Sequence, residues 1–251
     1  MRNAGVKLAT QDAPDIRPRA HGVDSTDGPI RTAALVAGGG ILLMAAVSAF
    51  GVFAVLGQLV VEGDASATAA AISGSEGLFR LGVASLYLIV VLDVVVAWAL
   101  RTVFRPVSDG MSTLAAWFRL AYSAVLLVAV SSLAEGPTLL TSPGGLTEAQ
   151  VEAEVMMRID SFDTVWMAGL MLFGLHLLLV GTLAFSSGYV PRALGVLLVI
   201  AGVGYAYDTV GTLLVQDAPT VSTVTFLGEF LLALWLVVRG PRLTTAAAQP
   251  R

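Results

Sequence analysis

Five ionisable residues lie inside long apolar stretches of this 251-residue chain, where charged side chains are rare. They are Asp93, Arg119, His176, Asp208 and Glu229. One charge at the centre of a membrane helix costs about 2.5–3.5 kcal/mol on insertion scales, so each group must face protein or water and needs a partner. Carboxylates and histidines in such positions are typical of sites that bind and release protons or cations.

The depth of each residue within its apolar stretch indicates which of them can meet. At a helical rise of 1.5 Å per residue, Asp93 and His176 lie about 18 Å, and Arg119 about 20 Å, from the same predicted face of the membrane. We therefore predict an ion pair between Asp93 and Arg119, with His176 as a hydrogen-bonding third member. Glu229 lies near the middle of its stretch, and Asp208 lies in the outer half.

The charges in the apolar stretches do not balance. One arginine faces three carboxylates, which leaves two negative charges if His176 is neutral. Either some carboxylates are protonated, or His176 is charged, or a cation binds. The alternative is a structural role, in which one buried ion pair and protonated acids only fix the packing of the helices. Helical spacing places Tyr122 on the face of Arg119, and Tyr205 flanks Asp208. The candidate polar site therefore comprises Asp93, Arg119, Tyr122, His176, Tyr205, Asp208 and Glu229.

The elements that must position these residues are membrane helices. The chain is 56% hydrophobic and 13% charged, against about 25% charged in average soluble proteins. A helix that crosses the hydrocarbon layer needs about 20 apolar residues. Six stretches qualify: 33–61, 81–100, 113–134, 164–185, 193–215 and 221–238. We predict an all-α transmembrane bundle of six helices over residues 32–240, with a disordered tail at 1–31 and a second tail at 241–251. The first stretch is long enough to tilt, or to bend near its glycines at 38–40.

The distribution of basic residues predicts the orientation of the bundle. Eleven of the 14 lysines and arginines fall in segments on one side of the predicted spans, and two fall on the other side. Cytoplasmic segments carry the excess of basic residues, so both termini are predicted to be cytoplasmic. The four tryptophans, at 98, 117, 166 and 235, fall near predicted span ends, where aromatic residues meet the membrane interface.

The longest predicted external segment, 135–163, contains a further helix. Pro137 is expected to break the preceding helix, and Thr147 with Gln150 has the spacing of a capping box. The helix that follows is amphipathic, and its apolar face carries Val151, Val155 and Ile159. We interpret it as a surface helix that leads into the fourth span; a lid over an external opening is the alternative.

The sequence lacks the residues that several classes of function require. The chain has no cysteine and two histidines, which excludes disulfides, cysteine-ligated metals and thiol catalysis and leaves too few ligands for a histidine-rich metal site. No phosphate-binding loop or serine-nucleophile motif is present. We expect no cofactor, no metal and no nucleic acid. The expected partners are the lipid bilayer and a proton or small cation, and the sequence identifies no protein partner.

Several short motifs resemble a bacterial membrane-protein family known as domain of unknown function 4386. They are residues 92–98 (Leu-Asp-Val-Val-Val-Ala-Trp), 117–120 (Trp-Phe-Arg-Leu) with Tyr122, Phe162-Asp163, Trp166, Gly169-Leu170, 173–177 (Phe-Gly-Leu-His-Leu), 187–192 (Ser-Gly-Tyr-Val-Pro-Arg), and 201–205 (Ala-Gly-Val-Gly-Tyr) with Asp208. The resemblance covers about residues 33–240. It implies a multi-pass protein of the bacterial cytoplasmic (inner) membrane and supplies no activity or functional residue.

Three functions remain open at this point. The first is a small transporter, a permease coupled to protons or cations, in which the unbalanced carboxylates bind the coupling ion. The second is a non-enzymatic interaction or sensory component whose buried charges only fix helix packing. The third, a membrane-embedded enzyme acting on lipids, is the least favoured because the sequence contains no nucleophile with a matching base.

Overall fold

The computed structural model describes residues 27–214, 221 and 226–243, and all regular secondary structure in these ranges is helical. The helices are α1 (Asp27–Ser48) with a π-helical continuation (Ala49–Leu56), α2 (Gly57–Leu59), α3 (Ala65–Gly74), α4 (Glu76–Phe104), α5 (Asp109–Thr141), α6 (Glu148–Ser186), α7 (Arg192–Leu214), α9 (Leu227–Arg239) and a final 3-10 turn (Gly240–Arg242). The predicted tails at 1–31 and 241–251 lie largely outside the described residues.

Five of the described helical segments are long and apolar enough to cross a membrane. They are residues Gly28–Leu59, α4, α5, α6 and Arg192–Gly211 of α7. By length and composition the chain is therefore a multi-pass membrane protein. Within the predicted sixth span, the structure describes α9, whose 13 residues measure about 20 Å. Residues 215–220 and 222–225 lie outside the described ranges, so the count of six spans and the orientation stay predictions.

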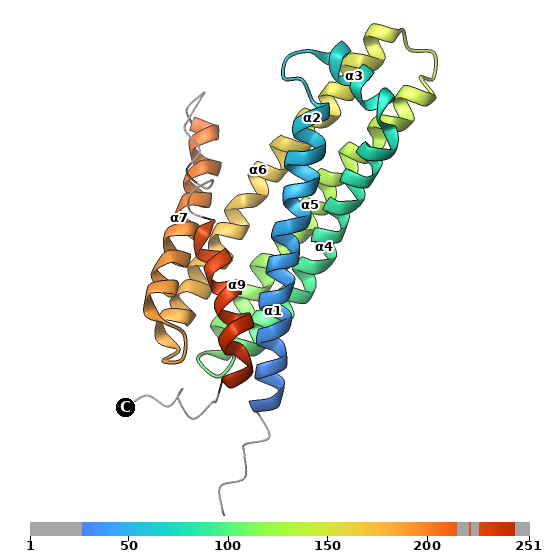
Figure 1. Cartoon of the computed structure of the whole chain (residues 1–251). Coiled ribbons are helices and arrows are strands. Elements are labelled where there is room, and N and C mark those ends of the chain that lie inside the picture. The colour runs from blue at the N-terminus through green and yellow to red at the C-terminus, as the bar shows by residue number, and fades with distance from the viewer. Residues whose placement is uncertain (1–26, 215–220, 222–225, 244–251) are drawn as a thin grey trace, which may run out of the picture.

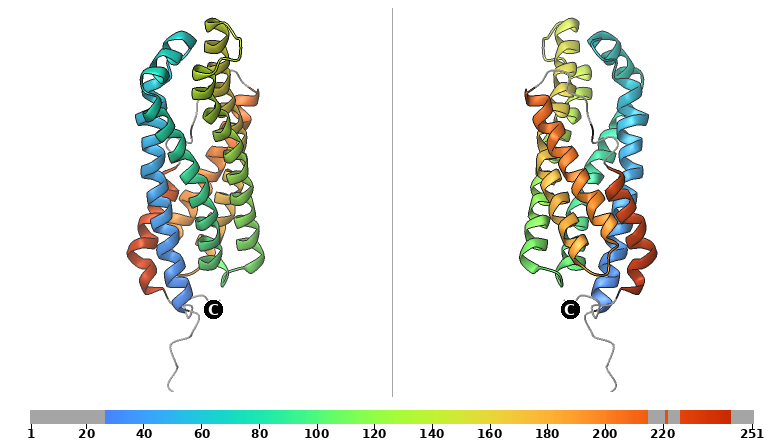
Figure 2. Two further views of the ribbon diagram at one scale, coloured as in Figure 1. Left: turned by 90° about the vertical axis from the view of Figure 1, so that its right-hand side faces the viewer. Right: turned by 90° about the vertical axis from the view of Figure 1, so that its left-hand side faces the viewer.

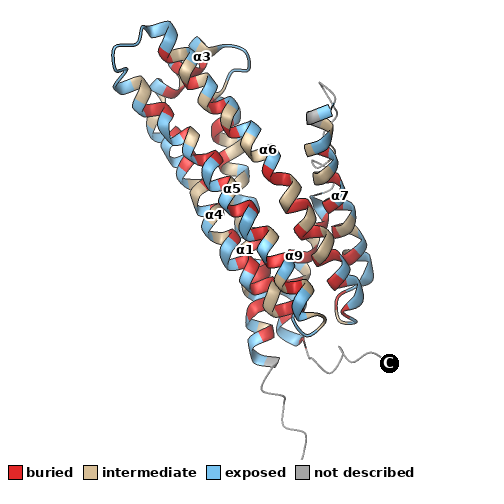
Figure 3. Ribbon diagram, turned by 180° about the vertical axis from the view of Figure 1, so that it is seen from behind, coloured by how far each residue is buried: buried red, intermediate tan, exposed pale blue. Residues whose placement is uncertain are grey.

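The outer surface of the bundle is largely apolar, and a few charged residues are buried in its mainly hydrophobic interior. On α4, Asp93 is 0% exposed, whereas Val91 and Trp98 are 59% and 57% exposed. Figure 3 shows exposed residues on the outward surfaces of the helices and buried residues where the helices meet. An apolar outer surface around buried charges is the arrangement that lipid requires, because lipid cannot solvate an ion.

The helices run alternately up and down. The end of the bundle where α1 begins and α9 ends is called the terminal end, and the opposite end is called the α3 end (Figure 1). Figure 2 shows from two further sides that α4, α5 and α6 extend together toward the α3 end. α9 packs against α1 and α7, and α7 packs along α6. Residues from α1, α4, α5, α6, α7 and α9 can therefore face one interior.

The turn from α6 to α7 follows the sequence prediction. Gly188 has a φ of +73°, a left-handed conformation that glycine adopts without strain, and Pro191 directly precedes α7. Tyr189 ties this turn to α4, because its hydroxyl donates a 2.7 Å hydrogen bond to the Val103 carbonyl. Burial raises the pKa of the Tyr189 phenol, which stays protonated and able to donate.

Glycines let α6 and α7 approach closely. A Cβ atom on Gly202 would lie 2.6 Å from the Gly174 carbonyl oxygen, and one on Gly181 would lie 2.8 Å from the Gly195 carbonyl oxygen. Since real Cβ atoms do not approach oxygens so closely, only glycine permits these contacts. The two backbones therefore touch from the level of Gly174 to the terminal end, as small residues allow in membrane helices.

The predicted amphipathic helix is the beginning of α6. Thr147 and Gln150 form the predicted capping box, in which the Thr147 amide donates to Gln150 Oε1 at 2.9 Å. The predicted apolar face is buried at Val151, Val155 and Ile159. α3, which the sequence analysis did not predict, packs against this part of α6, and Ser66 Oγ donates to Glu152 Oε1 at 3.0 Å. The prediction of a helix leading into the fourth span is confirmed, as one continuous helix.

One local prediction was wrong. α5 does not break at Pro137 but continues to Thr141, because its buried face extends through Leu133 and Pro137 and compensates for the missing N–H of the proline. α1 is one continuous helix through the glycines at 38–40, and its predicted tilt or bend stays a prediction. Gly38 permits close packing, since a Cβ there would lie 2.7 Å from the Ala233 carbonyl oxygen of α9. The irregular part of this helix is the π-helical segment Ala49–Leu56.

Candidate polar site inside the helical bundle

Arg119 lies at the centre of the site and is fully buried. Its Nε donates to Asp93 Oδ1 at 2.8 Å, and its Nη1 donates to Glu229 Oε1 at 2.8 Å. The predicted ion pair with Asp93 is present. The second ion pair, with Glu229, was not predicted and connects α5 to α9. The guanidinium also lies over the ring of Phe173, with 5.2 Å from its central carbon to the ring centroid.

His176 completes this group, which we call the Arg119 cluster (Asp93, Arg119, His176 and Glu229). Its Nε2 lies 3.2 Å from Arg119 Nη1, and its Nδ1 lies 2.8 Å from the Ala115 carbonyl oxygen. An arginine only donates and a carbonyl only accepts, so Nδ1 carries the hydrogen and Nε2 accepts. His176 is therefore held as the neutral tautomer, which argues against a charged histidine as the balance for the carboxylates.

The four cluster residues share one layer because each lies at the same depth in its helix. Arg119 follows the start of α5 by ten residues, and His176 and Glu229 precede the ends of α6 and α9 by ten. Asp93 precedes the end of α4 by eleven. Each is therefore about 15 Å from the terminal end of its helix. Depth counted from that end was the sequence signal that could have placed Glu229 in the cluster.

The cluster carries one more carboxylate than cation. With His176 neutral, Arg119 against Asp93 and Glu229 gives a formal charge of −1. Asp93 Oδ2 is buried and has no hydrogen-bond partner in the described part of the chain. An unpaired buried acceptor costs about 1–3 kcal/mol, and more when it is charged. The cluster therefore has both excess negative charge and a free acceptor atom.

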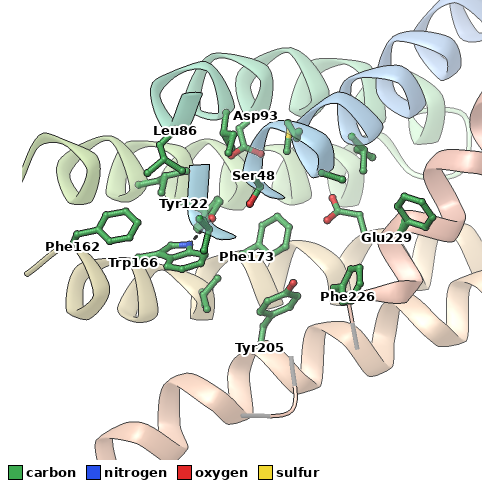
Figure 4. A pocket seen from close by; sticks show the side chains of 18 residues that line it. Ser48, Leu86, Asp93, Tyr122, Phe162, Trp166, Phe173, Tyr205, Phe226 and Glu229 are labelled. Carbon is green, nitrogen blue, oxygen red and sulfur yellow. Dashed lines mark hydrogen bonds between the residues drawn. The ribbon is translucent and has the colours of Figure 1, made fainter. Parts of the chain in front are cut away.

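A cavity of about 200 Å³ adjoins the cluster on its α3 side. Figure 4 shows side chains from six helices around it, including Asp93 and Glu229. Ser48, Tyr122 and Tyr205 add polar groups to its wall, so two further members of the candidate site lie there. Aromatic side chains make up much of the remaining wall: Phe162, Trp166, Phe173, Phe226 and Phe230.

The bundle is closely packed on the terminal side of the cluster. Ala97, Leu100, Ala115, Val180 and Leu183 enclose the space beyond His176, and that space cannot hold a water molecule. In the described residues the cluster therefore borders a cavity on its α3 side and closely packed side chains on its terminal side.

Asp208 is the one candidate residue that lies apart from this arrangement. It is buried, and its Oδ1 accepts a 2.8 Å hydrogen bond from the Val221 amide. It neither contacts Arg119 nor lines the cavity among the described residues. Asp208 thus binds the backbone at Val221, beyond α7. This local role is consistent with its position in the outer half of the helix.

The family model for domain of unknown function DUF4386 matches residues 36–240 of the chain. The chain belongs to this family. It is also 32% identical over 168 residues to an uncharacterized protein of Archaeoglobus fulgidus, an alignment that covers 67% of this chain and 89% of that protein. No solved structure matches the chain at a significant level. The family resemblance predicted from the motifs is thus confirmed, and the bacterial inner membrane stays a prediction.

The role expected for one tryptophan was wrong. Trp98 and Trp117 are exposed on the outer surface, as residues at the membrane interface would be. Trp166 instead lines the cavity, and its Nε1 donates to the Tyr122 hydroxyl at 3.1 Å. Phe162, Trp166 and Phe173 recur at helical spacing on the face of α6 that carries His176. The spacing of these aromatic residues could have indicated the cavity from the sequence, and the cavity was not predicted.

The described residues contain no group of three histidine, aspartate or glutamate side chains placed to hold a metal ion. Both nitrogens of His176 are engaged, by Arg119 and by Ala115. Its use as a general base would require one of these contacts to break. The chemistry that the site can perform without rearrangement is the binding of a proton or a cation at its carboxylates.

Proposed function

We propose that this protein is a small transporter, a permease in which the carboxylates of the Arg119 cluster bind a proton or a cation. The observation that carries the proposal is the difference in packing on the two sides of the cluster: a cavity adjoins it on the α3 side, and packed side chains close the terminal side. Such an asymmetry about a mid-membrane site is expected of a transporter in one state of alternating access.

The excess carboxylate supports the same function. A cluster with a formal charge of −1 takes up one positive charge more readily than a neutral ion pair would. Arg119 holds Asp93 and Glu229 about equally, at 2.8 Å each. A proton or cation that binds one carboxylate therefore leaves the other paired with arginine, and loading the site does not require breaking both ion pairs.

The second candidate function is a non-enzymatic sensory or interaction component. The packed terminal side favours it, because a cavity that never opens there is a binding pocket and not a pathway. In this case the cluster holds α4, α5, α6 and α9 together, and the cavity reports the presence of a ligand to a partner protein.

Cysteine labelling separates the two functions, because the chain has no native cysteine. Leu126→Cys places a thiol in the cavity wall, and Val180→Cys places one beyond the cluster, in the packed half. Val94→Cys, on the outer surface of α4, is the control for a lipid-facing position. Each variant is treated with a membrane-impermeant thiol reagent applied to one face or the other.

The permease is expected to label at Leu126→Cys from one face and, more slowly, at Val180→Cys from the opposite face. The Val94→Cys control is expected to stay unlabelled, because a thiol in lipid does not ionise. Complete protection of Val180→Cys at every pH and ion composition tested, while Leu126→Cys labels, would contradict transport and favour the sensory function.

A further inference from the structure

One unsatisfied acceptor lies just behind the cavity wall, at Asp93. Asp93 lines the cavity, its side chain is about 1% exposed, and its Oδ2 finds no hydrogen-bond donor in the residues that the structure describes. Protonation would not satisfy this atom, because an O–H there would lack an acceptor in its turn. A ligand that brings an N–H donor satisfies Oδ2 in the ionised state, in which Oδ1 keeps its bond to Arg119.

Charge excludes an anion from this position. The guanidinium of Arg119 is already engaged by Asp93 and Glu229, and His176 accepts from the same Nη1 that donates to Glu229. Among the described residues, the hydrogen-bond partner of Arg119 Nη2 is Met44 Sδ, at 4.0 Å. An anion in the cavity would therefore meet two carboxylates and a guanidinium whose charge they already balance. A monocation would instead bring the cluster and ligand together to a formal charge of zero.

The wall of the cavity is suited to an organic cation. Seven aromatic rings line it: Tyr122, Phe162, Trp166, Phe173, Tyr205, Phe226 and Phe230. The faces of such rings attract a cation and also pack against apolar groups. A bare metal ion would need about six oxygen ligands, and the wall supplies mainly carbon. Apolar walls with a few convergent polar groups are typical of small-molecule sites.

Volume limits the size of the ligand. An engineered protein cavity of about 150 Å³ holds one benzene molecule. The cavity of about 200 Å³ therefore accommodates one ring or branched alkyl group with a short arm that carries the charge. The arm would reach Asp93 and Glu229, and the apolar part would lie among the aromatic rings toward Phe162 and Trp166, at the other end of the cavity in Figure 4.

We propose that this cavity is a binding site for a small lipophilic ammonium ion, which is neutralised by the carboxylate pair Asp93 and Glu229 in the cavity wall and packs against the aromatic rings. A small displacement of the wall on binding lets an N–H of the ligand reach Asp93 Oδ2. The assignment builds on the proposed function, because it names the substrate class of the permease. Binding itself does not require transport, so the two can fail separately.

The probe is 2-phenylethylammonium, with 2-phenylethanol and 3-phenylpropanoate as a neutral and an anionic counterpart of similar size. Binding to the purified full-length protein in detergent is measured by titration calorimetry. The ammonium ion is expected to bind at least about tenfold more tightly than the alcohol, the difference of one charge-assisted hydrogen bond. The carboxylate is expected not to bind. Equal binding of the alcohol and the ammonium ion, or no binding of the ammonium ion, would overturn the assignment.

Two variants locate the site. Asp93→Asn should weaken ammonium binding by about tenfold or more, because it removes both the charge and the free acceptor. That change also removes a partner of Arg119, so Ser48→Leu provides a test that leaves the cluster intact. It fills the cavity wall and should abolish binding. Ser131→Leu, on the exposed surface of α5, is the matched control for partition of the probe into detergent. Unchanged binding by Ser48→Leu would place the probe elsewhere and overturn the proposal.

Counterflow of labelled 2-phenylethylammonium in proteoliposomes separates this assignment from the proposed function. Binding that depends on Ser48 and Asp93, without counterflow, would keep the site and overturn the permease. Proton-coupled movement of another solute, with no ammonium binding, would keep the permease and overturn the site.

Discussion

The two halves of the bundle on either side of the Arg119 cluster are built from the same helices but differ in packing. In α6, the half toward the α3 end presents Phe162, Trp166 and Phe173 to the interior, whereas the terminal half presents Gly174 and Gly181 to α7. Rings that line a wall without filling the space between helices leave a cavity of about 200 Å³. In the terminal half, glycines bring the backbones of α6 and α7 into contact. Side chains of α4, α5 and α6 leave no space for water beyond His176.

In the proposed permease, this difference in packing indicates which half has to move. The cluster lies on the boundary, so a ligand in the cavity already reaches its carboxylates. Passage beyond it requires separation of the close α6–α7 contacts or of the side chains around Leu100 and Leu183. Interiors packed as densely as protein cores change between discrete arrangements and do not deform continuously. The terminal half is thus the gate in the permease and the rigid base in the sensory alternative.

Removal of the arginine at the boundary is expected to have the largest effect. Arg119→Ala leaves Asp93 and Glu229 as unpaired buried carboxylates, at a cost of about 3–5 kcal/mol. The yield of monodisperse protein in detergent and its thermal unfolding midpoint should both fall sharply. Arg158→Ala is the control, since that arginine pairs with Glu135 and Glu154 at a half-exposed position, where an ion pair is worth about 1 kcal/mol or less.

Equal stability of Arg119→Ala and Arg158→Ala would show that the cluster does not hold α4, α5 and α9 together. The exchange of charges, Asp93→Arg with Arg119→Asp, sharpens the test. It should recover part of the folded yield lost in either single change, because it restores an opposite-charge pair between α4 and α5.

Enlargement of a side chain is expected to have different effects on stability in the two halves. Gly202→Ala adds one carbon where the Gly174 carbonyl oxygen would lie 2.6 Å away, and should destabilise the fold by about 1–3 kcal/mol. Ser48→Leu adds more carbon but into the cavity wall, and should change stability by about 0.5 kcal/mol or less. Gly39→Ala, with nothing within 4 Å, is the neutral control. Thermal unfolding midpoints in detergent measure these changes. A larger decrease in the midpoint for Ser48→Leu than for Gly202→Ala would contradict the prediction.

A smaller effect than that of Gly202→Ala is expected at the turn that closes the packed half. Tyr189→Phe removes the 2.7 Å hydrogen bond to Val103 and should cost about 0.5–1.5 kcal/mol. Burial raises the pKa of Tyr189 above its ordinary value of 10.0, so the unfolded chain loses this proton first as the pH rises. The advantage of the wild type over Tyr189→Phe is therefore present below pH 10 and declines above it. Unfolding midpoints at pH 8 and pH 11 check this, and an advantage that grew with pH would contradict it.

Structural features were predicted accurately from the sequence where a single strong physical constraint determined them. Charged side chains in apolar stretches need partners, and equal depth left Arg119 as the partner of Asp93, with His176 beside them. The α6–α7 turn was predictable from Gly188 and Pro191, which have few conformational choices. Helix type and approximate span positions followed from hydropathy alone, since lipid permits little besides helices.

The remaining features depended on tertiary packing, which the sequence pattern does not encode locally. Pro137 is tolerated inside α5 because the buried face continues on both sides of it. Trp166 faces the interior although its position along the chain is that of an interface residue. The pairing of Glu229 with Arg119 joins residues 110 positions apart, through a helix whose place beside α1 is set by Gly38 and Ala233.

The excess carboxylate of the Arg119 cluster has an electrical consequence. The cluster lies about 15 Å from the terminal end, so a positive charge that reaches it through the cavity has crossed only part of a transmembrane voltage. An elementary charge that crosses the whole membrane exchanges about 2.3 kcal/mol per 100 mV. In the proposed permease, occupancy of the carboxylates would therefore depend on voltage, and the sign of that dependence would report which side of the membrane the cavity faces.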